Sequence, residues 1–515
     1  MSTTGRRRGG RKARASQHRT DGPTQRPFSQ PHRYWEPTKA ISDDEVESIH
    51  LASLEVLRDI GIDVLHEEAR HLLAQAGASP ASDGARVRFD PDMVTEAISQ
   101  APTEFTLHAR NPAHNLKMGA NHLAFGAVAS APNVSGLGRD RRSGTATDFI
   151  DLVRLSQVLN AVHFHGGYPV EPIDWHASVR HLYATRELLT RSDKALHTYS
   201  LGRQRTLDTI EMVRIAHGLS EAEMDERPSI FSVINTSSPL RLDGPMIEGI
   251  LELSARNQVI VITPFTLAGA MAPVTVAGAL VQQNAEALAG IALTQLVRPG
   301  APVIYGGFTS NVDMQSGAPA FGTPEYLKAA LVGGQLARRY GLPYRSSNVN
   351  AANALDLQAA YESMFSLWGA VMGGANMIMH GAGWLEGGLR ASFEKMVVDA
   401  ELIQMVEAAL EPVVVDHETL AIDAIEDVGP GGHFFGTDHT QSRYRTAFHS
   451  PMLSDWRNFE SWDEAGRPTT DQAAERLAEE FLATHSDPPM EPDVADALEE
   501  FVKHRTDEGG VATDF

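Results

Sequence analysis

Between residues 123 and 410, short apolar runs alternate with longer segments whose apolar positions recur every three to four residues. The short runs are typical of buried strands and the longer segments of amphipathic helices. Eight strands are predicted, at Leu123–Val128, Val162–His165, Ala195–Ser200, Ile230–Asn235, Val259–Thr263, Val303–Phe308, Tyr344–Asn348 and Asn376–His380. Each is followed by a predicted helix, at Thr147–Asn160, Asp174–Thr190, Thr206–Leu219, Gly244–Asn257, Thr275–Val297, Pro324–Tyr340, Asp356–Met372 and Ser392–Leu410.

Strands that alternate with helices form parallel sheets with right-handed crossovers, and eight such units make a (β/α)8 barrel. An open doubly wound sheet is the alternative, and it would normally carry a phosphate-binding glycine loop. The glycine pairs at Gly306-Gly307, Gly333-Gly334 and Gly387-Gly388 follow neither G-x-G-x-x-G nor P-loop spacing. The predicted fold is therefore α/β, a (β/α)8 TIM barrel over residues 122–410.

Segments of different character flank the barrel. Residues 1–33 carry Arg6-Arg-Arg8 and further basic residues among Gly, Ser and Gln, and we expect a disordered basic tail. Residues 34–121 mix helical periods with short strands and predict an N-terminal α+β extension, which a capping box at Ser42–Glu45 opens. Residues 411–515 are irregular and then helical and acidic, and we expect a C-terminal extension packed on the barrel.

Composition narrows the class of protein. The chain of 515 residues has no cysteine, which excludes disulfides, thiolate metal sites and a catalytic thiol. No apolar run reaches the roughly 18 residues of a membrane span, and no apolar segment follows the basic N-terminus as in a secretory signal. The net charge of −22 argues against nucleic-acid binding in spite of the basic tail. We expect a cytoplasmic homo-oligomer with no membrane or nucleic-acid partner.

Candidate chemistry concentrates where the predicted strands end, because active residues of this fold lie at the carboxyl ends of the strands. The segment Met372–Glu394 reads as strand, glycine-rich loop and helix, and its loop carries His380, Trp384 and Glu386. The other strand ends and loops add Phe308, Phe321, Glu325, Arg345, Asn348, Gln358, Tyr361 and Glu362. Aromatic rings with carboxylates, and no cluster of basic residues, suit an organic cation such as a quaternary ammonium group better than a phosphate.

Other interpretations of these residues stay open. Phe308 and Phe321 could serve packing alone, His380 could bond a backbone group, and Glu386 could cap the next helix or pair with Arg390. The pair His163 and His165 shares one strand face and could bind a metal, as in metal-dependent barrel hydrolases. Such enzymes need further His and Asp ligands at later strands, and strand eight ends in His380 rather than Asp.

From about Tyr34 to His504 the sequence resembles the trimethylamine methyltransferase (MttB) family. The segments that carry the resemblance are Ala109–Pro112, Phe321–Glu325, Asp356–Glu362, His380–Leu389, Ser392–Lys395 and Val428–Gly432. The family fold is a (β/α)8 barrel, and its members transfer a methyl group from methylamines or betaines to a corrinoid protein. Archaeal members that use trimethylamine carry a pyrrolysine, which should fall within Tyr344–Asp356, and only ordinary residues stand there.

The resemblance therefore implies a relative of the glycine betaine methyltransferases that lack pyrrolysine. It implies a quaternary amine as substrate, a corrinoid carried by a separate partner protein, and no metal or cofactor bound by the chain itself. Carried over by motif position, His380, Glu386 and Glu362 would act in catalysis. Substrate binding would fall to Phe308, Phe321, Glu325, Arg345, Asn348, Gln358, Tyr361 and Trp384. A hydrolase using His163 and His165, or a non-catalytic betaine-binding protein, is the alternative.

Overall fold

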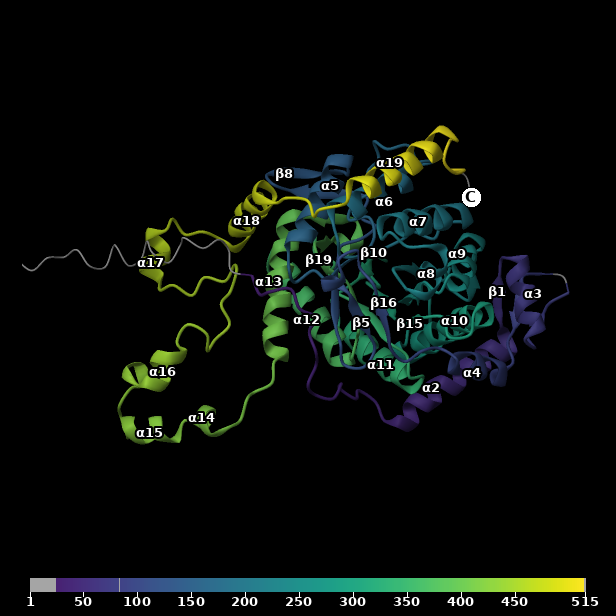
Figure 1. Ribbon diagram of the computed structural model, residues 1–515. Helices are drawn as coiled ribbons and strands as arrows, with labels where there is room; N and C mark the ends of the chain where they lie inside the picture. The colour runs from purple at the N-terminus through teal and green to yellow at the C-terminus, as the bar shows by residue number, and fades with distance from the viewer. Residues whose placement is uncertain (1–24, 83, 514–515) are drawn as a thin grey trace, which may run out of the picture.

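The computed structural model describes residues 25–82 and 84–513, and its centre is a closed ring of eight strands (Figure 1). Every neighbouring pair is parallel, and the last strand pairs with the first to close the ring. Around the ring they are β6 (Ala124–Ala127), β9 (Phe164–His165), β10 (Ala195–His197), β11 (Ile230–Ile234), β13 (Val259–Ile262), β15 (Val303–Gly306), β18 (Tyr344–Ser347) and β19 (Met377–Ala382). All eight predicted strands are present, which confirms the (β/α)8 barrel.

One long helix follows each strand and packs on the outside of the ring. These helices are α5 (Ala146–Val158), α6 (Arg180–Arg191), α7 (Arg203–Ala216), α9 (Gly244–Ala255), α10 (Val276–Val297), α11 (Pro324–Arg339), α12 (Leu357–Gly373) and α13 (Phe393–Leu410). A Ser, Thr or Asp side chain caps six of them by accepting a backbone N–H from the first turn. Each such cap stabilises its helix by about 1 kcal/mol, so the loop residues before the helices fix where they begin.

The interior of the barrel is filled with side chains. The rings of Phe164 and Phe231 meet edge to face with centroids 5.4 Å apart, and both are fully buried. Gly126 on β6 makes room for Phe164, because a Cβ atom at this position would lie 2.2 Å from the phenylalanine ring. The middle of the barrel is therefore a packed core, and a ligand can enter only at one end.

An α+β layer precedes the barrel in the chain and packs on α10. It consists of α2 (Asp43–Glu55), the π-helical turn Val56–Ile60, α3 (Glu67–Gln75) and α4 (Pro91–Ser99). The following hairpin of β4 (Phe105–Leu107) and β5 (Leu116–Met118), with a 3-10 turn at Pro112–His114, packs instead against the barrel strands, in one apolar cluster with Phe164 and Phe231. A mixed sheet in the order β12-β1-β3-β2 completes the layer, made of β1 (Ile62–Val64), β2 (Ser79–Pro80), β3 (Arg86–Arg88) and β12 (Arg241–Leu242). Because β12 comes from the middle of the barrel sequence, the layer is tied directly to the barrel.

Part of the expected basic tail is ordered. Residues 1–24 lie outside the described residues, but residues 25–33 cross the lower end of the barrel, where the strands begin. The ring of Phe28 packs on His114 and His163 with centroids 4.3 and 5.2 Å away. The backbone oxygen of Ser29 lies 3.0 Å from Nε2 of His163. The prediction of disorder is wrong for residues 25–33, because Phe28 fills an apolar opening that the barrel alone leaves uncovered.

Glu407 of α13 is buried at this lower end, and burial raises its pKa to about 8. Arg26 lies 3.9 Å and His163 3.8 Å from the carboxylate, and Glu411 adds a like charge. Burial lowers the pKa of His163 to about 4, so this imidazole is neutral above that pH and gives the carboxylate no charge partner.

Replacement of Glu407 by Gln should therefore stabilise the protein at alkaline pH. The folded carboxyl holds its proton up to about pH 8 while the unfolded one ionises near 4.5, so in this window the free energy of unfolding falls as the pH rises. In Glu407→Gln we expect a melting temperature about 2–4 °C above wild type at pH 9 and equal to it at pH 4. Equal melting temperatures at both pH values would contradict the burial of a titrating carboxyl. Burial also lowers the pKa of Lys194, to about 7. Wild type and Glu407→Gln share this residue, so its titration does not affect the difference between their melting temperatures.

Two small sheets surround the upper end of the barrel, where the strands end. One joins β14 (Phe265–Ala268), β16 (Phe308–Val312) and β17 (Pro319–Ala320), and the other runs β20-β21-β7-β8. The second is made of β7 (Asn133–Gly136), β8 (Arg139–Ser143), β20 (Trp384–Leu385) and β21 (Arg390–Ser392), with a 3-10 turn at Glu386–Gly388. Segments predicted as loops thus form the walls of the barrel mouth.

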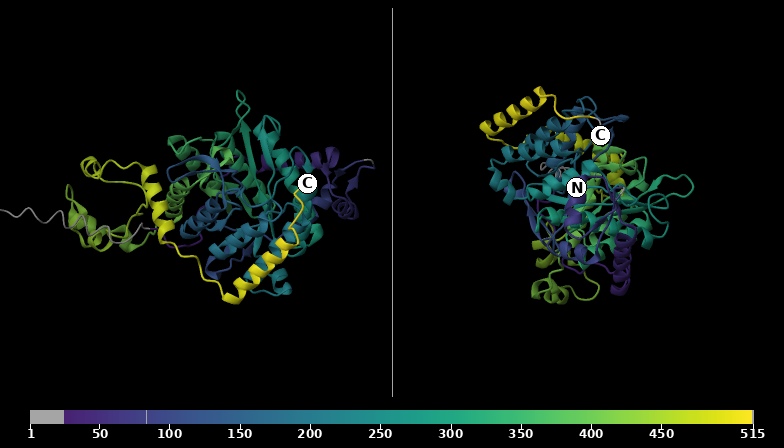
Figure 2. Two further views of the ribbon diagram at one scale, coloured as in Figure 1. Left: turned by 90° about the horizontal axis from the view of Figure 1, so that it is seen from above. Right: turned by 90° about the vertical axis from the view of Figure 1, so that its right-hand side faces the viewer.

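The C-terminal region divides into two parts that differ in packing. The helices α18 (Thr470–Thr484) and α19 (Pro492–Asp507) lie on the barrel helices, α18 on α5 and α13 and α19 on α6 and α7. Most of residues 411–468, here called the C-terminal arm, stands away from the body, and Met452 and Ser454 tie it to Glu401 of α13 by hydrogen bonds (Figures 1 and 2). The arm holds α14 (His417–Leu420), α15 (Ile422–Val428), a 3-10 turn at Phe434–Gly436, α16 (Asp438–Arg443) and α17 (Phe459–Glu464). The two C-terminal helices thus lie on the barrel, whereas most of the arm does not. No helix among the described residues is long and apolar enough to cross a membrane.

Candidate active site

A cluster of aromatic rings lies at the upper end of the barrel. Phe308 is its centre, with ring centroids 5.7 Å from Phe321, 6.2 Å from Trp384 and 6.0 Å from His380. The imidazole of His380 stacks on the indole of Trp384 at 5.0 Å and an interplanar angle of 12°. The structure thus brings together four residues from three separate segments of the sequence. Phe265, 5.1 Å from Phe308, joins them and was missed, because it follows strand five in a segment predicted as a loop.

Arg345 of β18 lies beneath this cluster. Its guanidinium stands 5.1 Å from the centroid of the Phe308 ring, and its Nη1 donates a hydrogen bond to the Gly307 carbonyl. The side chain is 2 % exposed, its Nε has no hydrogen-bond partner, and no carboxylate among the described residues pairs with it. Burial lowers the pKa of Arg345 to about 10, which still leaves it charged at neutral pH. A buried charge without a counter-ion is costly, so this position calls for an anionic ligand.

Further polar atoms in the same region are buried without partners. They are Nδ1 of His380 and Oδ1 of Asn348, while Nδ2 of Asn348 donates to the Gly381 carbonyl. Burial, with the positive charge of Arg345 close by, lowers the pKa of His380 well below its usual range. His380 is therefore a neutral imidazole, and it takes a left-handed backbone conformation at φ 55° where β19 bends into the mouth. Buried polar groups are normally paired, so several unpaired ones side by side indicate a binding site.

The glycine-rich loop that carries Trp384 is held in place by ion pairs. Glu386 accepts a hydrogen bond from Arg141 at 2.7 Å and pairs with Arg390 at 3.1 Å. Its backbone, like that of Gly387 and Gly388, is left-handed, with φ 53°. At Gly388 a Cβ atom would lie 2.6 Å from the indole of Trp384, so only glycine allows the ring to occupy its position. Each carboxylate oxygen of Glu386 is thus bound by an arginine, and the residue holds the loop in its conformation.

The three residues predicted near the start of α12 separate in space. Glu362 faces inward and accepts hydrogen bonds from the backbone N–H groups of Ala351 and Ala352 and from the side chain of Gln358. Tyr361 points away from the barrel and is 62 % exposed. Successive helical residues differ in direction by about 100°, so Tyr361 cannot join the aromatic cluster if Glu362 faces the barrel. The placement of Tyr361 among the cage residues is therefore wrong.

Glu325 differs from the other two carboxylates. It lies in the first turn of α11, four residues after Phe321, and is partly exposed. No hydrogen bond or ion pair to its side chain is found within the part of the chain that the structure describes. Among the predicted carboxylates it is the one free to meet a positive charge.

A buried ion pair beneath the loop was missed by the sequence interpretation. Lys395 and Asp399 of α13 are both fully buried, and Nζ of Lys395 pairs with the carboxylate and donates to Oγ of Ser363 at 2.8 Å. The other oxygen of Asp399 accepts the backbone N–H of Gly383 at 2.8 Å, one residue before Trp384. Lys395 is the last residue of the family-like segment Ser392–Lys395, and Asp399 follows it four residues later on a predicted helix. This i,i+4 spacing of opposite charges is the sequence feature from which the pair could have been predicted.

The histidine pair of the alternative hypothesis does not form a metal site. His163 precedes β9 at the lower end of the barrel, with Nδ1 accepting the N–H of Phe125 at 3.1 Å and Nε2 against the Ser29 carbonyl. His165 is buried, with its pKa lowered to about 3 by burial. Among residues 25–82 and 84–513, no three His, Asp or Glu side chains gather as metal ligands would. His163 therefore belongs to the closed lower end of the barrel and not to its mouth.

Together these features define a (β/α)8-barrel protein whose mouth combines aromatic rings with one buried, uncompensated cation. The sequence profile of the family described as trimethylamine methyltransferase (MTTB) matches residues 7–510. The chain therefore belongs to this family, and it is a methyltransferase.

Two relatives span nearly the whole chain. Glycine betaine methyltransferase of Desulfitobacterium hafniense (strain Y51) is 34% identical over 471 residues, which cover 91% of this chain and 98% of the relative. Trimethylamine methyltransferase MttB of Desulfitobacterium hafniense (strain DSM 10664 / DCB-2) is 29% identical over 476 residues, 92% of this chain and 95% of the relative. The crystal structure of the Methanosarcina barkeri monomethylamine methyltransferase (MtmB) has a TM-score of 0.47 at 13% identity, covering 89% of this chain and 94% of that one. The barrel assignment rests on the strand pairing of this chain itself.

Proposed function

We propose that the protein removes a methyl group from a quaternary amine that also carries a carboxylate, such as glycine betaine, and transfers it to the cobalt of a corrinoid held by a separate protein. The observation that carries this proposal is the buried guanidinium of Arg345, which has no carboxylate partner among the described residues and touches the aromatic cluster. A zwitterion matches this arrangement, since it offers an anion for Arg345 and a cation for the rings. The 34% identical relative is a glycine betaine methyltransferase, which supports the same choice.

The substrate carboxylate would bind Arg345, which presents planar N–H donors suited to a carboxylate. Nδ1 of His380 is unpaired nearby and, in the tautomer that carries its proton there, would donate a second hydrogen bond to the carboxylate. The ammonium group would lie against Trp384 and Phe321, because His380 already covers one face of Trp384 and Arg345 one face of Phe308. Such ammonium–ring contacts are worth about 0.5–2 kcal/mol each. Glu325, rather than Glu362 or Glu386, would add negative charge, because it is free of ion pairs.

The chemistry of a quaternary amine needs little acid–base help from the protein. The electron pair of the broken C–N bond stays on nitrogen, which leaves as a neutral tertiary amine, and the methyl carbon is bound by the reduced cobalt. No proton moves in this step, and a His380 that is neutral at physiological pH is consistent with that requirement. The residues of the mouth would act by holding the C–N bond in line with the incoming metal and by excluding water.

Loss of Trp384 should weaken both binding and turnover. In Trp384→Ala the ammonium loses its largest ring, and His380 loses the surface on which it stacks. We expect a higher KM, a lower kcat and a fall of about 10- to 100-fold in kcat/KM for glycine betaine, equivalent to about 1.4–2.7 kcal/mol. Trp384→Phe, which keeps a ring, should recover part of the loss. Unchanged kinetics in Trp384→Ala would remove this residue from the site.

A panel of amines tests the proposed substrate class. Purified protein is mixed with free cob(I)alamin and one amine, and the decrease in Co(I) absorbance is followed. Glycine betaine or another carboxylate-bearing quaternary amine should react fastest, choline more slowly because it lacks the anion, and trimethylamine least because its nitrogen is not quaternary. Trimethylamine as the best donor would contradict the proposal. Turnover of choline equal to that of every betaine would show that Arg345 does not bind a substrate carboxylate.

A further inference from the structure

The C-terminal arm is folded but has almost no core. Of its residues, only Ala424 and Leu453 are buried. Large apolar side chains that are mostly exposed occur along it, from Val413, 88 % exposed, through Phe435, 80 %, and Phe448, 86 %, to Trp456, 71 %. Its helices α14 to α17 have four to seven residues each, far fewer than the roughly 12–15 that an isolated helix needs in water. The arm therefore needs another surface to hold its conformation and cover its apolar side chains.

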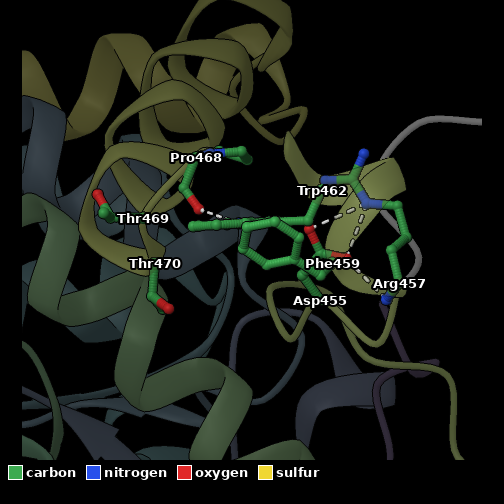
Figure 3. A pocket seen from close by; sticks show the side chains of 7 residues that line it. All are labelled: Asp455, Arg457, Phe459, Trp462, Pro468, Thr469 and Thr470. Carbon is green, nitrogen blue, oxygen red and sulfur yellow. Dashed lines mark hydrogen bonds and ion pairs between the residues drawn. The ribbon is translucent and has the colours of Figure 1, made fainter. Parts of the chain in front are cut away.

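The arm has few contacts of its own. Arg443 of α16 pairs with Glu418 of α14 at 2.9 Å, and Glu401 of α13 accepts hydrogen bonds from the backbone N–H groups of Met452 and Ser454. Further contacts lie at the far end of the arm. There the rings of Phe459 and Trp462 lie 5.9 Å apart, and the indole N–H of Trp462 donates to the Pro468 carbonyl (Figure 3). These groups line a cavity of about 520 Å³ together with Arg457, which pairs with Asp455. This local structure anchors the end of the arm next to α18, whereas most side chains of α14, α15 and α16 stay exposed.

A complementary surface exists on the outer face of α12. Leu357, Tyr361, Phe365 and Met372 are exposed along one side of this helix, at a spacing of four, four and seven residues. Trp368 and Met364 lie between them and are half-buried. The one charged residue of the helix, Glu362, faces inward, and Gln358 in the first turn is the polar side chain that is exposed beside this apolar row. A barrel helix that faced only water would carry polar residues there, as the neighbouring α11 does with Lys328 and Arg338.

Charge and area agree with a contact between these two surfaces. The arm carries eleven Asp and Glu against four Arg, a net charge of −7. Beside the α12 face, Lys328 and Arg338 form no ion pair with any carboxylate that the structure describes, and Arg338 reaches the end of α12 through the Gly373 carbonyl. The exposed aromatic residues of the arm number six (Phe434, Phe435, Tyr444, Phe448, Trp456 and Phe459). At about 150–250 Å² each when buried, they would supply on the order of 800 Å² per chain, the area that each partner buries in a standard interface.

The arm lies too far from the mouth to be covered mainly by the corrinoid protein that is proposed to dock there. The arm leaves the body at Leu410, the end of α13, and in this fold the helices end on the face opposite the carboxyl ends of the strands. It also stands off from its own body, on the outer side of α13 (Figures 1 and 2). A second copy of the chain offers an α12 face to the first arm while its own arm covers the first α12, a closed two-fold arrangement.

We propose that the protein is a two-fold symmetric dimer in which the C-terminal arm of each chain, residues 411–468, packs on the outer face of α12 in the other chain. This interface covers the apolar side chains of both surfaces and places the acidic arm beside Lys328 and Arg338. It is independent of the proposed substrate, since none of the interface residues lies in the aromatic cluster.

The mass in solution and a site-directed cross-link test the proposal together. Analytical ultracentrifugation of the full chain should give twice the chain mass of 55.9 kDa. Phe365→Glu should raise the dimer dissociation constant by at least about 100-fold, whereas Leu51→Glu, at an exposed apolar residue on α2, should leave it unchanged. A wild-type monomer, or a dimer that Phe365→Glu leaves intact, would overturn the proposal.

A photoreactive residue at position 365 identifies what covers α12. Irradiation should produce a covalent dimer, and mass spectrometry of its digest should find residue 365 joined to a peptide from residues 411–468. A cross-link within a single chain would show that each arm folds back on its own body and would overturn the proposal. A cross-link between chains to any other segment would do the same.

Discussion

Replacement of Arg345 by Met is expected to lower kcat/KM for glycine betaine by about 100- to 1000-fold. The substrate carboxylate would then be buried without its cation, and loss of one partner of a buried charged pair costs about 2–5 kcal/mol. Met keeps the apolar stem that packs beneath Phe308, so the aromatic cluster should stay in place. Steady-state rates of Co(I) loss with glycine betaine and with choline measure the effect.

Choline separates binding of the carboxylate from general damage, because it has the same ammonium group and no carboxylate. Its kcat/KM should change less than threefold in Arg345→Met. Arg88→Met, an exposed arginine on β3 of the N-terminal layer, removes the same charge outside the mouth and should leave both substrates unaffected. Equal losses for glycine betaine and choline would mean that Arg345 supports the fold of the mouth and does not bind the carboxylate.

The second large effect is expected at the buried ion pair. Lys395→Met should destabilise the protein by about 3–5 kcal/mol, because it leaves the fully buried Asp399 without its cation. At roughly 2.1 cal/mol/K of unfolding entropy per residue, a chain of 515 residues would lose about 3–5 °C in melting temperature. Burial lowers the pKa of Lys395 and raises that of Asp399, while their mutual attraction opposes both shifts.

Two comparisons identify the cause of that loss. Lys395→Met with Asp399→Leu removes both charges and should be more stable than Lys395→Met alone. Lys503→Met breaks an exposed pair of the same i,i+4 spacing, with Lys503 and Asp507 74 % and 65 % exposed, and should change the melting temperature by less than 1 °C. A double variant no more stable than the single one would show that packing, and not the unpaired carboxylate, is responsible.

The alternation of apolar runs and helical periods predicts the barrel well, because each βα unit follows from local pattern and parallel pairing then leaves few topologies. The strands that form the walls of the mouth are not predicted from local pattern. β14 pairs with β16, 43 residues further on, and β21 with β7, which lies more than 250 residues earlier. Such short strands form only because a distant segment supplies the hydrogen bonds, and their own sequence resembles a loop.

The candidate site shows the same division. His380, Trp384, Phe308 and Arg345 follow from the rule that active residues end the strands, and the structure brings them together. The orientation of helical residues does not follow from that rule. Gln358, Tyr361 and Glu362 share the first turns of α12, yet Glu362 is tied to the backbone of Ala351 and Ala352 while Tyr361 faces outward. The long loop Val349–Asp356 decides the phase of the helix, and no pattern in the sequence specifies its path.

Phe28 and the C-terminal arm were misjudged for a related reason. A single apolar residue in a polar tail looks unstructured until the opening that it fills is known. The apolar residues of the arm suggested packing on the barrel, whereas the barrel helix next to it, α13, is already covered by α18. In both segments the decisive partner is a surface that only the assembled fold creates.

The most direct test of the central claim is the product formed from glycine betaine. The protein, free cob(I)alamin and glycine betaine labelled with carbon-13 in its methyl groups are incubated, and dimethylglycine is quantified by NMR against the loss of Co(I) absorbance. The proposed function predicts that one dimethylglycine forms for each Co(I) consumed. With Arg345→Met at the same substrate concentration, it predicts neither dimethylglycine formation nor loss of Co(I) above background. Loss of Co(I) without dimethylglycine, or no reaction with any carboxylate-bearing quaternary amine, would contradict it.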